Sequence, residues 1–369
     1  MQLYLHIPFC KSKCRYCDFN SYACRDEQAI FEYLNALNKE FDLASEWYKD
    51  EKIDTVYVGG GTPSLLQGSL CWSLLNNLAC AFDLQSVKEW TIECNPESLT
   101  EEKLKLYKDV GVNRISLGVQ SLDNNNLKAV GRLHTSNQAL EKLELAGKYF
   151  DNVSADLIVG LPYDSEDIVK RQVETFANLT SHISMYELML EEGTALDKMV
   201  KSGKISLPDD DRVQELFDVA FDTACANGFE RYEVSNFARD GKISHHNYGY
   251  WTREEYLGFG AGAHSLVKIG GEEQRYCNFC SLNDYKKAVE NADDFWKIAR
   301  DETQILTQKD IRNERIMLGL RTQKGVKECD MLKVPQNLEI FFKREGGYVS
   351  LTRKGMNVMN SILTEILDI

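Results

Sequence analysis

Three cysteines stand close together near the start of the chain, at Cys10, Cys14 and Cys17. Thiolates at this spacing can bind three irons of a [4Fe–4S] cubane and leave the fourth iron without a protein ligand. An open iron suits chemistry, as an open coordination position does in catalytic zinc sites. The spacing matches neither the paired cysteines of zinc sites nor a four-cysteine ferredoxin run. The sequence therefore predicts one [4Fe–4S] cluster on these three residues.

A glycine-rich loop, GGGTPS at residues 59–64, follows the second predicted strand. Glycines without side chains let the backbone approach a ligand closely and offer it N–H and C=O groups. The same residues also suit a tight turn from a strand into a helix that begins at Pro63 and Ser64. The loop is no phosphate loop, because the Lys-Ser/Thr signature is missing.

Polar residues occur at or near the ends of later predicted strands, at Glu93, Gln120, Arg132 and Asp156. A charge within a buried strand costs free energy unless it is paired or bound to a ligand. The carboxyl groups of Glu93 and Asp156 therefore require partners. Position alone leaves open whether the partner is a ligand or an internal arginine, Arg114 or Arg132.

Alternating strands and helices position these residues. We expect six strands, at residues 3–7, 55–58, 89–93, 114–119, 154–159 and 183–188. Several are nearly continuous apolar runs, typical of parallel strands covered on both faces. Helical patterns lie between them at residues 29–48, 65–82, 101–110 and 137–150. The alternation predicts an α/β fold built from βαβ units. Six units favour an incomplete barrel over the closed eight-unit barrel, and a doubly wound sheet stays open.

After about residue 208 the pattern changes. A helix is expected at 211–227, followed by an aromatic and glycine-rich stretch at 229–267. Further helices are expected at 311–320 and 336–344, then a strand at 348–351, a turn at 352–355 and a last helix from Met356. We interpret residues 1–230 as the barrel, 231–305 as a connecting segment and 306–369 as a smaller, mainly helical, winged-helix-like module. The net charge of −14 favours a structural cap over DNA binding for this module.

The composition limits the classes of partner. Lys and Arg number 43 against 57 Asp and Glu, so a general electrostatic grip on nucleic acid or anionic lipid is disfavoured. The first residues show no export signal, and no run of about twenty apolar residues predicts a membrane span. We therefore expect a cytoplasmic protein whose eleven cysteines are thiols or metal ligands. Peripheral membrane association and the oligomeric state stay open.

Four longer runs resemble a known family: YLHIPFC at 4–10, GGTPS at 60–64, GVQS at 118–121 and DLIVGLP at 156–162. With the cysteine loop, they resemble the radical S-adenosylmethionine (SAM) superfamily. Within it they resemble the subfamily of oxygen-independent coproporphyrinogen III oxidase and the HemW heme chaperones. The resemblance implies a partial (β/α)6 barrel that binds a [4Fe–4S] cluster and SAM, whose methionine amine and carboxylate chelate the open iron. By motif match, the SAM-contacting positions are Tyr4, Tyr16, Gly60, Gly61, Thr62, Glu93, Gln120, Arg132 and Asp156.

Phe19 distinguishes the two branches of this subfamily. The oxidases carry a fourth cysteine two residues after the third, where this chain has Phe19. Cys10 also lies so near the first residue that we expect no oxidase-like N-terminal extension. The resemblance therefore implies a chaperone that binds heme and delivers it to apo-haemoproteins, including respiratory-chain types. The alternative is a radical enzyme acting on a porphyrinogen, in which the reduced cluster cleaves SAM to a 5′-deoxyadenosyl radical. Whether SAM is cleaved stays open.

The segment HHNYGYW at residues 245–251 resembles the His-Asn-x-x-Tyr-Trp motif of the chaperones. An imidazole can bind heme iron, and aromatic rings can stack on a porphyrin. The resemblance implies heme contact by His246 without establishing it as the axial ligand. Spacing alone favours a structural histidine with packed aromatics around it. His6 and His264 are weaker candidates, and the Cys277–Cys280 pair lacks the second pair of a zinc site.

Overall fold

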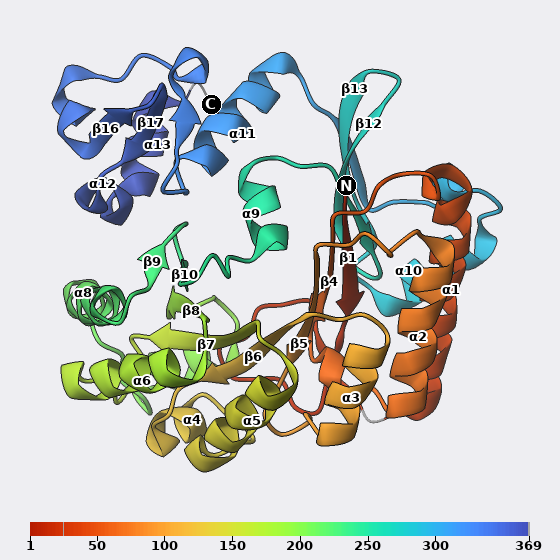
Figure 1. Ribbon diagram of the computed structural model, residues 1–369, viewed down its shortest axis with the longest axis horizontal. Coiled ribbons are helices and arrows are strands. Elements are labelled where there is room, and N and C mark those ends of the chain that lie inside the picture. Colours follow the sequence, from red (N-terminus) through yellow and green to blue (C-terminus); the bar gives the residue numbers. More distant parts are fainter. Residues whose placement is uncertain (25, 368–369) are drawn as a thin grey trace.

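The computed structural model of this chain describes residues 1–24 and 26–367 (Figure 1). Its central sheet has the strand order β14-β13-β12-β11-β1-β4-β5-β6-β7-β8-β10-β9. Six parallel strands form its middle: β1 (Gln2–Ile7), β4 (Thr55–Gly60), β5 (Glu89–Cys94), β6 (Arg114–Gln120), β7 (Val153–Val159) and β8 (His182–Glu187). Because the sheet ends in two different strands, it is an open barrel. The predicted incomplete barrel is confirmed.

Helices cover the outer face of these strands (Figure 1). They are α1 (Glu27–Tyr48), α2 (Gly68–Ala81), α3 (Glu101–Asp109), α5 (Ser136–Tyr149), α6 (Glu166–Leu179) and α8 (Asp210–Ala226). Side chains of Thr100, Thr135 and Ser165 accept backbone N–H bonds at the starts of α3, α5 and α6, as good N-caps do. The predicted helices agree with these bounds to within a few residues, except α6, which was not predicted.

The strands present different residues to their two faces. Side chains such as Leu5, Val58 and Leu117 are fully or almost fully buried in the core that the strands share with the outer helices. Since neighbouring residues on a strand point to opposite faces, the intervening side chains, among them Glu93 and Asp156, point into the barrel. The interior of the barrel is therefore polar, and it is the place where a ligand can bind.

The segment predicted as a connection adds strands to the same sheet. These are β10 (Asn236–Ala238), β11 (Tyr256–Phe259), β12 (His264–Ile269), β13 (Glu272–Cys277) and β14 (Glu302–Ile305). β11 pairs in parallel with β1, and β12 to β14 extend the sheet with antiparallel pairs. A short strand, β9 (Glu230–Arg231), pairs with β10, and α9 (His245–Trp251) lies against β4. Residues of this segment also share the main hydrophobic core, together with α10 (Leu282–Asn291).

The C-terminal module has a core of its own. It contains α11 (Gln308–Gly319), β15 (Val326–Lys327), β16 (Phe342–Glu345), β17 (Tyr348–Leu351), α12 (Arg353–Asn357) and α13 (Met359–Ile366). In Figure 1 it lies beside the open end of the sheet, joined to it by α11. The last two residues of the predicted range, 368–369, lie outside the described ones. No helix in the described part of the chain is long and apolar enough to cross a membrane.

The prediction of one helix over residues 336–344 is wrong. A 3-10 turn at Gln336–Phe341 leads directly into β16. β16 pairs with β17 across Gly346 and Gly347, which are both at positive φ. The hydrogen bonds of this hairpin stabilise the strand more than helix propensity would stabilise a helix here. The predicted last helix from Met356 is divided into α12 and α13 around Val358.

One carboxylate joins the C-terminal module to the barrel. Glu314 of α11 lies 2.9 Å from Nη2 of Arg253 and also binds both terminal nitrogens of Arg275. Nη2 of Arg253 is also 2.9 Å from Glu273 of β13. The side chains of Arg253 and Glu314 are only 6% and 15% exposed, so this network is largely withdrawn from water.

We expect Glu314→Gln to lower the free energy of unfolding by about 1.5–3 kcal/mol, because two guanidinium groups lose their shared charged acceptor. Urea unfolding measures this change. The control is Glu339→Gln, which removes an exposed ion pair with Arg344 in the same module and should cost less than about 1 kcal/mol. Equal effects of the two substitutions would show that Glu314 does not join the units.

Candidate cofactor site

The loop that carries the cysteines is held at both ends. Its first cysteine, Cys10, belongs to β2 (Phe9–Cys10), which pairs in parallel with β3 (Tyr22–Ala23). In the middle of the loop, the backbone N–H of Arg15 donates to the carbonyl of Val130 at 2.9 Å. Nζ of Lys13 donates to the carbonyls of Phe19 and Ser21 at 3.0 and 3.3 Å. The loop is therefore fixed against the barrel.

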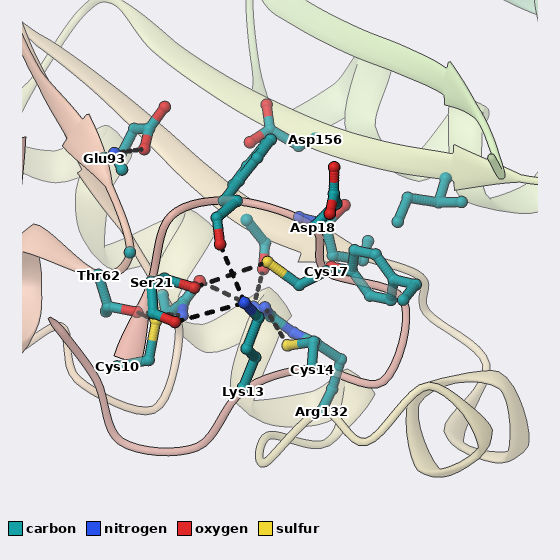
Figure 2. A pocket seen from close by; sticks show the side chains of 18 of the residues that line it. Cys10, Lys13, Cys14, Cys17, Asp18, Ser21, Thr62, Glu93, Arg132 and Asp156 are labelled. Atoms are coloured by element: carbon teal, nitrogen blue, oxygen red, sulfur yellow. Dashed lines mark hydrogen bonds between the residues drawn. The ribbon is translucent and has the colours of Figure 1, made fainter. Parts of the chain in front are cut away.

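The three thiol groups face one side of a cavity of about 380 Å³ (Figure 2). Each sulfur has a polar neighbour: the Thr62 hydroxyl donates to Cys10 at 3.5 Å, and Nη1 of Arg132 donates to Cys14 at 3.4 Å. The Ser21 hydroxyl lies 3.8 Å from Sγ of Cys17. Such neighbours stabilise the thiolate form that a metal requires. Burial by itself raises the pKa of the Cys10 thiol, so the metal must supply the remaining stabilisation.

The thiol arrangement suits a cluster rather than a single ion. All eleven cysteines of the chain are free. Three thiols of one loop that face the same side of a cavity can bind three irons of a cubane, whose fourth iron would then face the cavity.

Almost all the predicted SAM positions line this cavity. They are Tyr16, Gly60, Gly61, Thr62, Glu93, Gln120, Arg132 and Asp156. Tyr4 lines an adjoining cavity instead, where its hydroxyl lies 3.0 Å from Nδ1 of His6. A volume of about 380 Å³ is within the range of small-molecule sites. The tertiary fold thus brings together residues from separate strands and loops of the barrel.

At two positions beside the cavity, Gly60 and Gly61, neighbouring atoms leave no room for a side chain. Gly60 has φ +112°, and a Cβ atom there would lie 2.7 Å from the ring of His6. A Cβ atom on Gly61 would lie 2.8 Å from the carbonyl oxygen of Phe9 and 3.0 Å from Sγ of Cys10. A larger residue at Gly60 would displace His6 and one at Gly61 would displace Cys10, so the loop acts as a cradle beside the thiols.

Glu93 and Asp156 lie in the same cavity without a cation bound to them. Burial, with repulsion from Asp156, raises the pKa of Glu93 to about 7, although its carboxylate accepts bonds from Tyr57 and Gly60. Burial likewise raises the pKa of Asp156, whose carboxylate accepts a bond from Ser116 at 3.3 Å. These carboxyl groups stand on the far side of the cavity from the cysteines in Figure 2.

An internal ion pair is not the partner of these acids. Among the described residues, neither Glu93 nor Asp156 forms an ion pair with Arg114 or Arg132, although the charge of Arg114 offsets part of the rise in the pKa of both acids. Arg114 instead contacts His182 at 3.4 Å, while Arg132 binds Asn95, Gly118 and Cys14. The carboxyl groups therefore suit a ligand that brings positive charge, as the amine and sulfonium of SAM do.

Sequence analysis missed Asn95, which links the two sides of the cavity. Its Oδ1 accepts from Nη2 of Arg132 at 2.8 Å, and its Nδ2 donates to the Thr62 hydroxyl at 3.1 Å. Thr62 in turn donates to Cys10, so a chain of bonds joins the first cysteine to Arg132. Its place directly beyond the strand end that carries Glu93 was the available signal.

His246 lies outside this cavity and is fully buried. Its Nδ1 lies 2.8 Å from the Thr55 hydroxyl, its Nε2 lies 2.9 Å from the Tyr250 hydroxyl, and its ring stacks on Tyr57. Burial, with repulsion from Arg114, lowers the pKa of His246 to about 3. Both ring nitrogens are occupied, so this geometry corresponds to the structural alternative and presents no free nitrogen to a heme iron.

Comparisons with known proteins agree with this geometry. The family model of the radical SAM superfamily matches residues 4–174. The heme chaperone HemW of Lactococcus lactis is 39% identical over 328 residues, which cover 88% of this chain and 82% of the relative. HemW of Bacillus subtilis is 35% identical over 326 residues, 88% of this chain and 84% of the relative. The solved coproporphyrinogen III oxidase HemN of Escherichia coli, a radical SAM enzyme, superposes with a TM-score of 0.85 at 21% identity and covers 98% of this chain and 89% of that chain.

We expect Cys14→Ser to abolish cluster assembly, because a hydroxyl does not replace a thiolate as an iron ligand at this site. Iron and sulfide analysis after anaerobic reconstitution measures the change, and circular dichroism checks the fold. Cys80→Ser, at an exposed position of α2, is the matched control and should retain the full cluster. A complete cluster in Cys14→Ser would show that its ligands lie elsewhere.

The raised pKa of Glu93 predicts a pH dependence of stability. The folded protein without ligand binds a proton at Glu93 more tightly than the unfolded chain, so its free energy of unfolding falls as pH rises from about 4.5 to about 7. Glu93→Gln removes this loss, which is at most about 3 kcal/mol because the cavity admits water. We expect the variant to gain stability relative to the parent as pH rises, while SAM binding is lost.

Urea unfolding of the cluster-free protein across this pH range measures the effect. Glu144→Gln, at an exposed position of α5, should leave the pH dependence of the parent unchanged. A constant difference between Glu93→Gln and the parent at all pH values would mean that Glu93 has no raised pKa.

Proposed function

Because this chain belongs to the radical SAM superfamily and, within it, to the HemW heme-chaperone family, we propose that it binds heme and delivers it to apo-haemoproteins. The observation that carries the proposal is the similarity to HemW proteins over 88% of the chain. Phe19 supports it, since a phenyl ring rather than a thiol stands beside the cluster loop. Haemoproteins of the respiratory-chain type are the acceptors that we propose.

We propose that Cys10, Cys14 and Cys17 hold three irons of a [4Fe–4S] cluster, with SAM in the cavity beside it. This superfamily uses the pair for one-electron chemistry on SAM, and the cluster can also serve assembly or heme transfer. Gly60 and Gly61 let the ligand approach the backbone, and Glu93 and Asp156 accept its cationic groups. Thr62 and Arg132 stabilise the thiolates through their bonds to sulfur.

The rim of the cavity suits an apolar ligand or partner. Phe19 and Met189 are 69% and 71% exposed, and Tyr186 and Leu190 are exposed as well. All but Leu190 line the cavity. Exposed apolar side chains that gather around one opening are typical of a binding surface, whereas apolar side chains scattered singly over a surface are not. This surface supports heme handling at the open side of the barrel.

A second candidate is a radical enzyme acting on a porphyrinogen. Its support is the complete cavity beside the cysteines, which would serve SAM cleavage equally well. Phe19 weakens this candidate, because the oxidase branch carries a cysteine at that position.

Titration of the purified protein with heme, with and without the reconstituted cluster, tests the proposal. We expect a Soret band that saturates at a fixed stoichiometry, and transfer of that heme to an apo-haemoprotein with a distinct spectrum, such as apomyoglobin. Absence of a heme-dependent Soret band in both forms would overturn the chaperone proposal. Formation of protoporphyrinogen from coproporphyrinogen III under anaerobic reducing conditions would instead support the enzyme.

A further inference from the structure

A second cavity, of about 600 Å³, lies between the barrel and the C-terminal module. Its walls come from β1, from the segment between α9 and β13, and from α11. It shares Phe19, Gly60 and Glu93 with the cluster cavity, so the two spaces adjoin. The volume is within the range of cofactor pockets. The carboxylate network at Glu314 holds α11 in place as one wall.

The histidines of this chain can be sorted by what their rings bind. The chain has six. His6 contacts Tyr4 and Asn20, His134 contacts Val119 and Glu97, and His182 contacts Ser154 and Tyr232. His246 is occupied by Thr55 and Tyr250. Among the described residues, only His245 and His264 have rings without a hydrogen-bond or ion-pair partner.

His264 is the one of these two that faces a cavity beside the cluster. It is the first residue of β12, it is exposed, and it lines the second cavity. Partial burial, with repulsion from Arg275, lowers the pKa of His264, so the imidazole is neutral at neutral pH. A neutral imidazole has a lone pair that can bind iron. His245 lies at a different surface, beside Lys88 and Asn113.

The other walls of the cavity match the chemistry of a porphyrin. Aromatic and apolar side chains line it, namely Phe19, Tyr250, Tyr256, Leu266, Met317 and Leu318. Tyr250 meets Tyr256 edge to face at 4.8 Å. Arg253 and Arg275 also line it, and Glu273 and Glu314 balance their charge. A large planar apolar ligand with a metal at its centre fits this combination of flat rings and one free imidazole.

The His-Asn-x-x-Tyr-Trp segment has a definite place in this arrangement. Its first residue, His246, binds the Tyr250 hydroxyl at 2.9 Å and so fixes the ring that lines the cavity. Glu89 accepts the backbone N–H groups of His245 and His246 at 2.9 and 3.0 Å, which anchors the start of α9. The segment therefore builds a wall, and His246 acts as a positioning residue.

We propose that His264 is the protein ligand of the heme iron, with the heme in the second cavity beside Phe19. This inference rests on the proposed chaperone function and names the site of that function. It places the heme next to the cluster cavity, and it moves the iron ligand from the buried His246 to His264.

The test is a heme titration of the full chain with its cluster reconstituted, comparing the parent with His264→Gly and His245→Gly. We expect His264→Gly to weaken heme affinity at least tenfold and to change the ferric heme spectrum. Added imidazole should restore the parent spectrum, because it can occupy the space of the missing ring. The control His245→Gly, which removes the other unpartnered ring, should bind heme as the parent does.

The possible outcomes separate this inference from the proposed function. A parent protein that binds no heme overturns the proposed function itself. A parent that binds heme while His264→Gly keeps its affinity and spectrum overturns only the assignment of His264, and so does a loss confined to His245→Gly. Iron and sulfide content and circular dichroism check the fold of each variant. If His264→Gly fails these checks, His264→Gln retains the side-chain volume without an imidazole and is expected to show the same loss.

Discussion

Two acidic side chains in the barrel interior, Glu93 and Asp156, have no cation bound to them. A buried carboxylate without such a partner is costly, and here the pKa values of both groups are raised. Arg114 and Arg132 lie in the same interior and offset part of the rise in the pKa of Asp156, but among the described residues neither forms an ion pair with these two acids. A cationic ligand would offset the free-energy cost of burying these two carboxylates. The empty barrel is therefore less stable than the barrel with such a ligand bound. An open sheet suits this, since a closed barrel would have no entrance on that side.

The parallel direction of the strands explains why the cysteine loop lies beside these acids. The carboxyl ends of parallel strands meet at one edge of the sheet, and the cysteine loop and the glycine cradle follow two neighbouring strands, β1 and β4. The carbonyl oxygen of Phe9 and Sγ of Cys10 lie so close to Gly61 that a Cβ atom would not fit there. Asn95 and Arg132 then extend the bonding across the cavity to Cys14. Hydrogen bonds thus connect two of the cysteines to each other through Thr62, Asn95 and Arg132.

The C-terminal module forms one wall of a second cavity at the open side of the barrel. By pairing Glu314 with Arg253 and Arg275, it fixes α11 opposite β12 and encloses a second space next to the first. The aromatic segment around α9 supplies another wall. A cofactor cavity and a larger aromatic cavity that share Phe19 give the molecule two adjoining compartments, which suits a protein that handles both a cluster and a tetrapyrrole.

Local sequence determined much of this protein. The cysteine spacing, the glycine loop and the strand–helix alternation predicted an α/β fold of βαβ units and several residues of the first cavity, because these features depend on residues near one another in the chain. The family resemblance supplied the remaining cavity positions, such as Tyr16. Tertiary structure decided the rest. His246 has no free ring nitrogen because Thr55 and Tyr250 occupy both, and Thr55 is far away in sequence. Strands β11 to β14 join the sheet through β1, β10 joins it through β8, and β16 forms through its pairing with β17 rather than through helical propensity. Thr55 and β1 lie far in sequence from the residues that they bind, so short-range patterns do not contain these contacts. The hairpin of β16 and β17 differs, because its Gly346–Gly347 turn is a short-range signal that the helical interpretation overlooked.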